Sequence, residues 1–363
     1  MQRLNKRILL ITESLGAGGA ERQICGLSAM LKNCGNECRL ITYVENQYYE
    51  SYLRQNGVDY ALLPNLCEKS TRVFRLARYI NVYKPDVVIS YLPSVNITLC
   101  LAKPFINARL IVSERSNRVK VSLYDRLLFN LYRMADYVVP NSITQAEYIK
   151  KNFPFLTQRT RPIINFVDIN RFKPSKNKTH GGTFRIITVA RYIPSKNIIK
   201  YLKVVRVVKD MGLNVRFQWY GDRHSNEEYY ASIEEEYHKL AVEDYLELND
   251  VHRNIEEIYR TSDLFFLPSL LEGYPNVIVE AMSSGLPVIC SNRFENPYIV
   301  ENGQNGYLFD PEDVDGMVSA ICKILNLTES DYLSMCKRNR ECVVSRNSEK
   351  KFLKSYIDLI EKS

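Results

Sequence analysis

Two glutamates, Glu272 and Glu280, are the side chains best placed to do chemistry together, because only seven residues separate them within residues 267–291. The apolar run before them, residues 263–268, predicts a buried strand. Gly285 and the apolar residues after it predict a helix end followed by a second buried strand. Glu272 therefore falls in a loop at the carboxyl end of a strand, where open α/β sheets bind ligands.

The backbone between the two glutamates is expected to bind an anion. The residues that open the predicted helix are Gly273, Tyr274, Pro275, Asn276 and Val277. A helix amino terminus carries partial positive charge and suits a phosphate group. Glu280, about two helical turns further on, would face the same crevice. We therefore predict that these residues and both glutamates line one ligand site.

Two further groups suit a diphosphate. Arg191 and Lys196 follow the apolar run 184–190, where two cations can converge on phosphate oxygens, although each alone would be an ordinary solvated cation. Gly18 and Gly19 belong to a glycine-rich loop that leads from the first apolar run into a predicted helix. Glycine lets a backbone approach phosphate closely, but a tight strand-to-helix turn also needs glycine for steric reasons alone.

Together these motifs resemble those of the family 4 glycosyltransferases, which are retaining, nucleotide-sugar-dependent enzymes with two Rossmann-like domains, the GT-B architecture. Nearly every element of the family pattern PSxxEGxPxxxxEAMxxGxPV is present, and the Gly-Gly-Ala-Glu-Arg loop and the Arg-x4-Lys pair match two more motifs. The resemblance implies that Arg191 and Lys196 neutralise the leaving nucleotide. It also implies that Glu272 holds hydroxyls of the donor sugar, that Glu280 holds the ribose hydroxyls, and that the glycine-rich loop lies against the donor's phosphates and the acceptor.

Three shorter segments also resemble the family. Residues 164–172 are similar to its interdomain segment, with Phe166 in place of the usual glycine, and Asn165 there is either a donor contact or a structural turn residue. Gly221 lies in a Tyr-Gly-Asp turn that resembles the family's turn near the nucleotide. Val251 begins the stretch where the family holds the base of its donor.

One loop departs from the usual pattern. Many members have a histidine there that contacts the transferring sugar, whereas residues 112–117 read Val-Ser-Glu-Arg-Ser-Asn. This loop resembles a Ser-Glu-Arg-Asn variant found in a subset that builds bacterial surface polysaccharides, often from galactose- or N-acetylhexosamine-type donors. The resemblance places Glu114, as a catalytic candidate, and Arg115 at the sugar–acceptor junction. A buried structural pair of the two is the alternative.

The rest of the chain supplies the elements that must position these residues. Apolar runs at 7–12, 38–42, 86–90, 108–112 and 137–140 alternate with amphipathic stretches, and a second series follows at 184–190, 215–220, 245–248, 264–267 and 288–290. This alternation indicates an α/β fold, and we predict two Rossmann-like, doubly wound parallel-sheet domains, which in the GT-B architecture face a deep cleft. We assign residues 1–172 to an acceptor-binding domain, 173–182 to a linker, 183–345 to a nucleotide-sugar-binding domain, and 346–363 to a C-terminal helix that packs back toward the first domain.

Composition excludes several classes of protein. The nine cysteines include no C-x-x-C pair and the four histidines are scattered, so we expect reduced thiols and no metal site. No cofactor is expected either, because the nucleotide-sugar is a co-substrate. No apolar stretch reaches the roughly 18 residues of a membrane-spanning helix, and the run after the basic start of the chain is too short for a signal peptide. We therefore expect a cytoplasmic protein.

Charge is unevenly distributed. Residues 1–172 carry 24 Lys+Arg against 13 Asp+Glu, whereas residues 173–363 carry 25 against 28. Residues 70–80 and 118–133 combine apolar residues and arginines at helical spacing, which is typical either of a membrane-surface helix or of an ordinary domain helix with solvated arginines. We predict peripheral docking to the anionic inner face of the plasma membrane. Nucleic acid is not expected as a partner, because it would not explain the acidic pair.

We predict a retaining, metal-independent hexosyltransferase. It would move a hexose or N-acetylhexosamine from a nucleoside-diphosphate sugar, expected to be a UDP-sugar, to a lipid-linked or polysaccharide acceptor in the synthesis of a capsule, O-antigen or similar glycan. Two alternatives are a sugar-nucleotide epimerase of the same architecture and a non-catalytic partner subunit. A non-catalytic subunit should have lost Glu272, Arg191 or Lys196, and all three are present.

Overall fold

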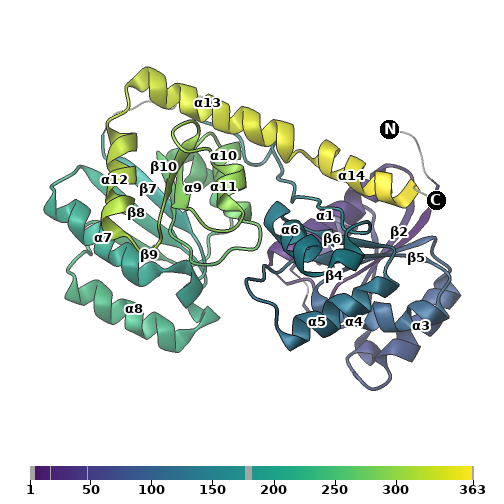
Figure 1. The fold of residues 1–363 in the computed structure, drawn as a ribbon. Helices are drawn as coiled ribbons and strands as arrows, with labels where there is room; N and C mark the ends of the chain where they lie inside the picture. Colours follow the sequence, from purple (N-terminus) through teal and green to yellow (C-terminus); the bar gives the residue numbers. More distant parts are fainter. Residues whose placement is uncertain (1–4, 17, 47, 176–181, 362–363) are drawn as a thin grey trace. The chain divides into compact units, whose positions relative to one another are not determined.

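The structure is a computed structural model, and it describes residues 5–16, 18–46, 48–175 and 182–361. The chain forms two compact units, unit 1 (Met1–Phe166 with Glu349–Ser363) and unit 2 (Val167–Ser348). Figure 1 shows a sheet covered by helices in each unit. Every strand pairing in both sheets is parallel, so the predicted α/β fold with two doubly wound parallel-sheet domains is confirmed.

Unit 1 has a sheet in the order β3-β2-β1-β4-β5-β6. Its strands are β1 (Arg7–Ile11), β2 (Glu37–Thr42), β3 (Asp59–Leu62), β4 (Val87–Tyr91), β5 (Arg109–Glu114) and β6 (Tyr137–Pro140). Its helices are α1 (Gly19–Asn33), α2 (Glu50–Gln55), α3 (Arg72–Tyr83), α4 (Pro93–Ala102), α5 (Leu123–Leu131), α6 (Ile143–Asn152) and α14 (Glu349–Glu361).

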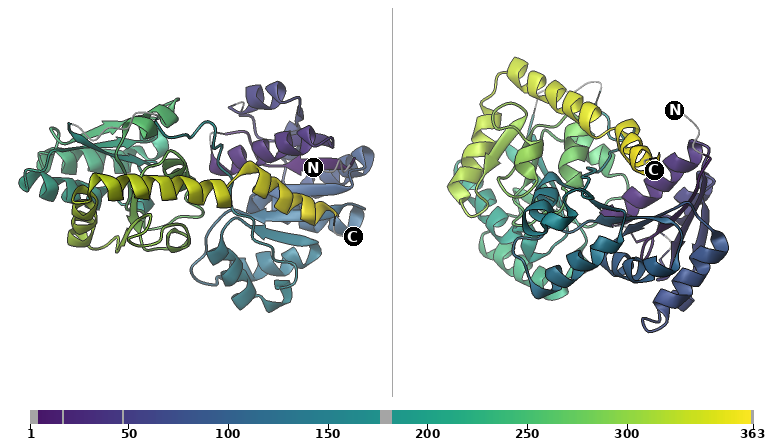
Figure 2. Two further views of the ribbon diagram at one scale, coloured as in Figure 1. Left: turned by 90° about the horizontal axis from the view of Figure 1, so that it is seen from above. Right: turned by 45° about the vertical axis from the view of Figure 1, so that its right-hand side comes forward.

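The core of unit 1 lies on both faces of its sheet. Successive side chains of a strand point to opposite faces, so Ile8 and Leu10 pack in one cluster with α1 and α14, whereas Leu9 and Ile11 pack in another with α3, α4 and α5. Figures 1 and 2 show α14 beside α1. Burial on both faces explains why the central strands read as continuous apolar runs.

Unit 2 has a sheet in the order β12-β11-β10-β7-β8-β9. Its strands are β7 (Phe184–Val189), β8 (Val215–Tyr220), β9 (Leu246–Asn249), β10 (Leu264–Leu267), β11 (Val288–Ser291) and β12 (Gly306–Phe309). Its helices are α7 (Ile198–Asp210), α8 (Glu227–Lys239), α9 (Ile255–Thr261), α10 (Asn276–Ser283), α11 (Asn296–Ile299), α12 (Val314–Leu325) and α13 (Glu329–Arg346). Phe266 stacks on Tyr201 of α7, while its neighbour Phe265 contacts Tyr259 of α9, so this sheet too is covered on both faces.

Strands β3 and β12 were not predicted. Each lies at one edge of its sheet. No residue of β3 is fully buried, and the two central residues of β12 are only half-buried. A short edge strand with partial burial has no continuous apolar run, so it lacks the signal that reveals central strands.

The chain passes between the units at Phe166–Val167 and again at Ser348–Glu349. The first crossing precedes the predicted boundary at 172/173, because residues 167–172 bond to unit 2. Arg340 of α13 donates to the carbonyl oxygens of Ile169, at 2.8 Å, and Phe172, at 2.7 Å. Helix α14 belongs to unit 1, whereas the predicted linker falls largely on residues 176–181, outside the described residues.

Candidate active site

The carboxyl edge of the unit 2 sheet carries the predicted donor-site residues. Strands β10, β7, β8 and β9 are consecutive neighbours, and because they are parallel their following loops emerge at one edge. These loops contain Glu272 after β10, Arg191 after β7, Gly221 after β8 and Val251 after β9. The fold therefore gathers residues that are far apart in the sequence.

Lys196 and Glu272 form an ion pair at this edge. The Nζ atom of Lys196 lies 2.7 Å from Oε1 of Glu272, and the two side chains are only 15% and 10% exposed. The loops that carry them are also joined through their backbones, since the Leu270 N–H donates to the Ser195 carbonyl oxygen at 2.8 Å. The predicted phosphate cation and the predicted sugar-binding carboxylate are thus direct partners.

Helix α10 begins beside this pair. Its N-cap position is Pro275, no side chain caps its amino terminus, and its first turn has no acidic residue. The Asn276 N–H donates to the Tyr274 carbonyl oxygen at 2.9 Å, and the Ile278 N–H donates to that of Pro275 at 3.0 Å. The partial positive charge of a helix amino terminus still favours an anion there. Gly273, Asn276 and Val277 are half-buried, whereas Pro275 is buried.

Glu280 is buried on α10, next to a tyrosine that the sequence did not single out. The Tyr259 hydroxyl lies 3.4 Å both from Oε2 of Glu280 and from the Val277 carbonyl oxygen. Tyr259 comes from α9, which follows β9. This contact orients the carboxylate that was predicted to hold the ribose.

The remaining predicted donor residues differ in exposure. Arg191 is exposed, and among the described residues it has no ion-pair partner. Gly221 is buried, and a Cβ there would lie 2.0 Å from the Ala190 carbonyl oxygen, so packing alone requires glycine. Val251 is exposed.

Asn197 was missed and organises the same edge. It has a left-handed backbone, with φ of 62°, a conformation that asparagine tolerates better than most residues. Its side chain donates to the carbonyl oxygens of Pro268, at 3.2 Å, and Pro311, at 2.8 Å. An asparagine directly after the Arg-x4-Lys pair is the only sequence signal of this role.

In unit 1, the predicted phosphate loop precedes α1. Gly18 is the N-cap residue of α1 and Gly19 its first residue, with no side-chain cap. The space above Gly18 is taken by Glu21, because a Cβ on Gly18 would lie 2.1 Å from Oε2 of Glu21. Burial raises the pKa of Glu21. A phosphate at this terminus would therefore have to displace the Glu21 carboxylate.

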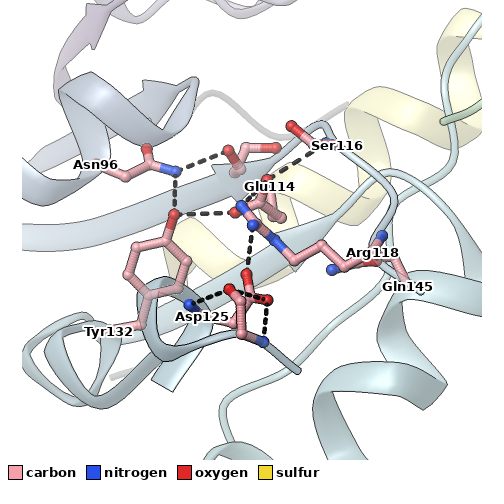
Figure 3. A network of polar contacts seen from close by, with 9 residues as sticks. Asn96, Glu114, Ser116, Arg118, Asp125, Tyr132 and Gln145 are labelled. Atoms are coloured by element: carbon pink, nitrogen blue, oxygen red, sulfur yellow. Dashed lines mark hydrogen bonds and ion pairs between the residues drawn. The ribbon is translucent and has the colours of Figure 1, made fainter. Parts of the chain in front are cut away.

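Glu114 lies in a buried polar network at the end of β5, which Figure 3 shows. The Tyr132 hydroxyl donates to its Oε2 at 3.0 Å, the Ser116 N–H donates to its Oε1 at 3.3 Å, and Nη2 of Arg118 lies 3.6 Å from the same Oε1. Arg118 also contacts Asp125 at 2.5 Å. Burial is the main cause that raises the pKa of Glu114, and Arg118 opposes it.

These contacts correct the alternative for the Ser-Glu-Arg loop, a buried pair of Glu114 with Arg115. Glu114 itself is fully buried, so its predicted contact with a substrate finds no support in this structure. It does not pair with Arg115 either, because adjacent side chains at a strand end point to opposite faces. The Arg115 guanidinium lies 3.7 Å from the Tyr91 ring centroid and donates to Oδ1 of Asn165 at 2.6 Å. Asn165, for which the sequence left open a donor contact or a turn, is buried, and its side-chain oxygen accepts this hydrogen bond from Arg115.

The arginines of residues 70–80 partly serve unit 1 itself. Arg72 is buried, lies 4.5 Å from the Tyr43 ring centroid, and donates to the Cys67 carbonyl oxygen at 2.9 Å. Arg75 forms an ion pair with Glu68 at 2.8 Å. For this segment, the contacts favour the ordinary domain helix over a membrane-surface helix.

The part of the chain that the structure describes has neither a cluster of metal-ligating side chains nor a membrane-spanning helix. No three histidine, cysteine, aspartate or glutamate side chains gather there as a metal ion would require. Likewise, none of the helices within the described ranges is both long and apolar enough to cross a membrane.

Two family models match the chain in succession. "Glycosyltransferase Family 4" matches residues 17–171, and "Glycosyl transferases group 1" matches residues 169–341. The two matches meet close to the first crossing between the units.

Similar proteins include named bacterial enzymes. A UDP-Gal:alpha-D-GlcNAc-diphosphoundecaprenol alpha-1,3-galactosyltransferase of Escherichia coli is 28% identical over 49% of this chain and 47% of its own length. The chain thus spans about half of that relative. The GalNAc-alpha-(1->4)-GalNAc-alpha-(1->3)-diNAcBac-PP-undecaprenol alpha-1,4-N-acetyl-D-galactosaminyltransferase of Campylobacter jejuni is 24% identical over 88% of this chain and 89% of its own.

Solved structures share the fold. The Anabaena protein HepE in complex with UDP and glucose has a TM-score of 0.85 at 17% identity, covering 99% of this chain and all of that one (100%). A glycosyltransferase from Rickettsia africae has a TM-score of 0.85 at 15% identity, covering 98% of each chain.

Proposed function

Because this chain belongs to the family 4 glycosyltransferases of GT-B architecture, we propose that it is a retaining enzyme that uses a nucleoside-diphosphate sugar, namely a UDP-sugar. It moves a hexose or N-acetylhexosamine to a lipid-linked or polysaccharide acceptor in cell-surface glycan synthesis. The observation that carries the proposal is the mostly buried Lys196–Glu272 ion pair beside the uncapped start of α10.

The chemistry follows from where charge develops. Breaking the bond between the anomeric carbon and the diphosphate creates positive charge on the sugar and negative charge on the leaving phosphate. Arg191, Lys196 and the amino terminus of α10 stabilise that anion, and we propose that no metal ion is needed. The acceptor hydroxyl attacks from the side of the leaving group, and this side of attack retains the anomeric configuration. A phosphate oxygen takes the proton of the hydroxyl.

The carboxylates hold the donor rather than act as bases. Before the donor binds, Glu272 balances the charge of Lys196. A bound diphosphate supplies Lys196 with a second anionic partner, while sugar hydroxyls donate to Glu272. Glu280, oriented by Tyr259, holds the ribose hydroxyls. The ion pair thus holds the Lys196 ammonium and the Glu272 carboxylate in position before the donor binds, so that one can contact the diphosphate and the other the sugar.

The substrate classes rest on relatives. The E. coli protein is named for UDP-Gal and a diphosphoundecaprenol-linked acceptor, and the C. jejuni protein for an undecaprenol-linked glycan. An amylovoran biosynthesis glycosyltransferase of Erwinia amylovora is 24% identical over 84% of this chain. These names support a UDP-sugar donor and a polyprenyl-diphosphate-linked acceptor. The epimerase alternative is dropped, because both family models describe glycosyltransferases.

A lipid-linked acceptor requires contact with a membrane, and we assign this contact to residues 119–127 of unit 1. The exposed apolar residues of this docking surface are Val119, Val121, Leu123, Tyr124 and Leu127. Two exposed cations, Lys120 and Arg126, lie among them. The outer face of a domain helix is normally polar, so an exposed apolar patch indicates an interaction site. Apolar side chains mixed with cations suit a surface of anionic lipid.

The position of this surface suits the acceptor. Residues 119–127 follow the carboxyl end of β5, the sheet edge at which α/β domains bind ligands. A polyprenyl chain held there would leave its diphosphate-linked sugar at that edge. We therefore propose that the enzyme acts in the cytoplasm, at the inner face of the plasma membrane.

The decisive experiment is turnover with a panel of donors. Purified protein is incubated with UDP- and GDP-linked glucose, galactose and their N-acetyl forms, and nucleotide release is measured with and without EDTA. We expect one UDP-sugar to be preferred, with no effect of EDTA. Proton NMR of a transferred product should show the α-anomer. Nucleotide binding without turnover toward any acceptor would favour the non-catalytic partner subunit.

A further inference from the structure

Tyr274 lies in the loop between β10 and α10, residues 268–275, which we call the donor loop, and its hydroxyl is bonded inside unit 2. The side chain is buried, and Nδ2 of Asn347 donates to its hydroxyl oxygen at 2.5 Å. Asn347 is also buried and is the C-cap residue of α13. The loop that carries Glu272 and Gly273 is therefore tied to a residue distant in sequence.

Asn347 stands where the chain is about to leave unit 2. Helix α13 ends at Arg346 and unit 2 at Ser348, and the Asn347 carbonyl oxygen accepts the N–H of Val167 at 3.0 Å. Val167 is the first residue of unit 2 after the other crossing. Both crossings thus meet at Asn347. We call the two crossings, Phe166–Val167 and Ser348–Glu349, together with Asn347, the joint.

The other end of helix α10 contacts the segment that follows the first crossing. Ser283, the last residue of α10, donates through its hydroxyl to the Phe172 carbonyl oxygen at 2.6 Å. Arg340 donates to the same Phe172 carbonyl oxygen at 2.7 Å and to the Ser283 hydroxyl oxygen at 2.8 Å. The loop before α10 is thus bonded to Asn347, next to the second crossing, and the end of α10 is bonded to Phe172, five residues after Val167.

On the unit 1 side the joint is fixed as well. The side-chain amide of Gln23 accepts from the Phe166 N–H at 3.0 Å and donates to the Phe166 carbonyl oxygen at 2.9 Å. Phe166 is therefore held by unit 1 and Val167 by unit 2. The Phe166 carbonyl oxygen and the Val167 N–H belong to one planar peptide group, so this single peptide is hydrogen-bonded on one side to Gln23 and on the other to Asn347.

We infer that Tyr274 is a positioning residue that links occupancy of the donor loop to the joint through Asn347. This inference rests on the proposed function of the loop. A diphosphate bound at Gly273 and the start of α10 fixes the Tyr274 backbone, and the hydrogen bond to Asn347 passes that constraint to both crossings. Loss of the hydroxyl should then impair turnover more than nucleotide binding, because conformational steps limit many turnover rates.

The test uses Tyr274→Phe, which removes only the hydroxyl. Its matched control is Tyr332→Phe, because Tyr332 is another buried tyrosine of unit 2 whose hydroxyl donates to a carbonyl oxygen, that of Asp263 at 2.7 Å. Calorimetry with UDP should give affinities within about twofold of wild type for both variants, whereas kcat should fall about tenfold or more only for Tyr274→Phe. Asn347→Ala should lower kcat similarly, with no further loss in the double variant.

Hydrogen exchange of the Val167 amide on UDP binding distinguishes the proposed link from a merely structural role of Tyr274, which would not affect it. In the wild type, UDP should slow exchange of the Val167 amide, and in Tyr274→Phe this slowing should disappear. Equal losses of UDP affinity and kcat/KM in Tyr274→Phe would instead make Tyr274 a direct donor contact. A kcat and a UDP affinity like those of Tyr332→Phe would make it an ordinary core residue. Either result overturns the inference. A wild-type protein that binds no nucleotide would refute the proposed function itself.

Discussion

Replacing Lys196 by methionine tests the candidate site most directly. The variant removes the ammonium group that lies 2.7 Å from the Glu272 carboxylate, in a place where the side chains are only 15% and 10% exposed. Breaking a buried ion pair costs about 3–5 kcal/mol, because the remaining charge loses its partner without regaining water. The residual exposure points to the lower end of that range. We expect a loss of about 3 kcal/mol in the free energy of unfolding.

The same substitution should also reduce catalysis. Removing one group that stabilises developing charge typically lowers kcat by about 10²-fold or more. The double variant Lys196→Met with Glu272→Gln separates the two effects, because it removes the stranded charge as well. Most of the stability should return in the double variant, while turnover stays low.

Lys200→Met is the matched control. Lys200 forms an ion pair with Glu312, but these side chains are 29% and 57% exposed. An exposed pair contributes at most about 1 kcal/mol, so this variant should lose little stability and keep its kcat. Urea unfolding can be followed by fluorescence, because the single tryptophan, Trp219, is buried in unit 2. Equal losses of stability and equal kcat values for Lys196→Met and Lys200→Met would refute the role of the pair.

Four other predictions follow from the same geometry. Glu280→Gln should weaken nucleotide affinity at least about tenfold in calorimetry, and unchanged affinity would remove Glu280 from the site. Arg191→Ala should lower kcat about 10²-fold with a smaller change in KM, and an equal loss in nucleotide binding would mean ground-state binding only. Burial raises the pKa of Glu114, so its contribution to stability is present at low pH and declines as pH rises through the folded pKa; urea unfolding should show wild type losing stability relative to Glu114→Gln as pH rises above the ordinary pKa of a glutamate, and a constant difference would contradict this. Leu123→Ser with Leu127→Ser should reduce sedimentation with anionic vesicles at least about tenfold, since each leucine is worth about 1.5–3 kcal/mol when buried, and unaltered sedimentation would move the docking surface elsewhere.

The candidate residues could be chosen from the sequence, but the contacts between them could not. Glu272 and Lys196 were recognised separately, by motif spacing and by position after apolar runs. Their contact depends on β10 lying beside β7, and strand order is a property of the sheet that no local pattern encodes. The central strands were readable because both their faces are buried, whereas β3 and β12 carry no such run.

Glu114 shows where a resemblance and the physics of a strand diverge. The Ser-Glu-Arg motif suggested that the two charged neighbours act together, but alternation along the chain sends them to different surroundings. Tyr132 lies in the turn after α5 and Arg118 in the loop before it, and both reach Glu114 only in the folded unit. A buried carboxylate with such partners can still matter for the acceptor, since Arg118 connects it through Asp125 to the start of α5, next to the exposed Leu123 and Leu127. A substitution at Glu114 would then change acceptor binding through the placement of α5 and leave nucleotide binding in unit 2 unaltered.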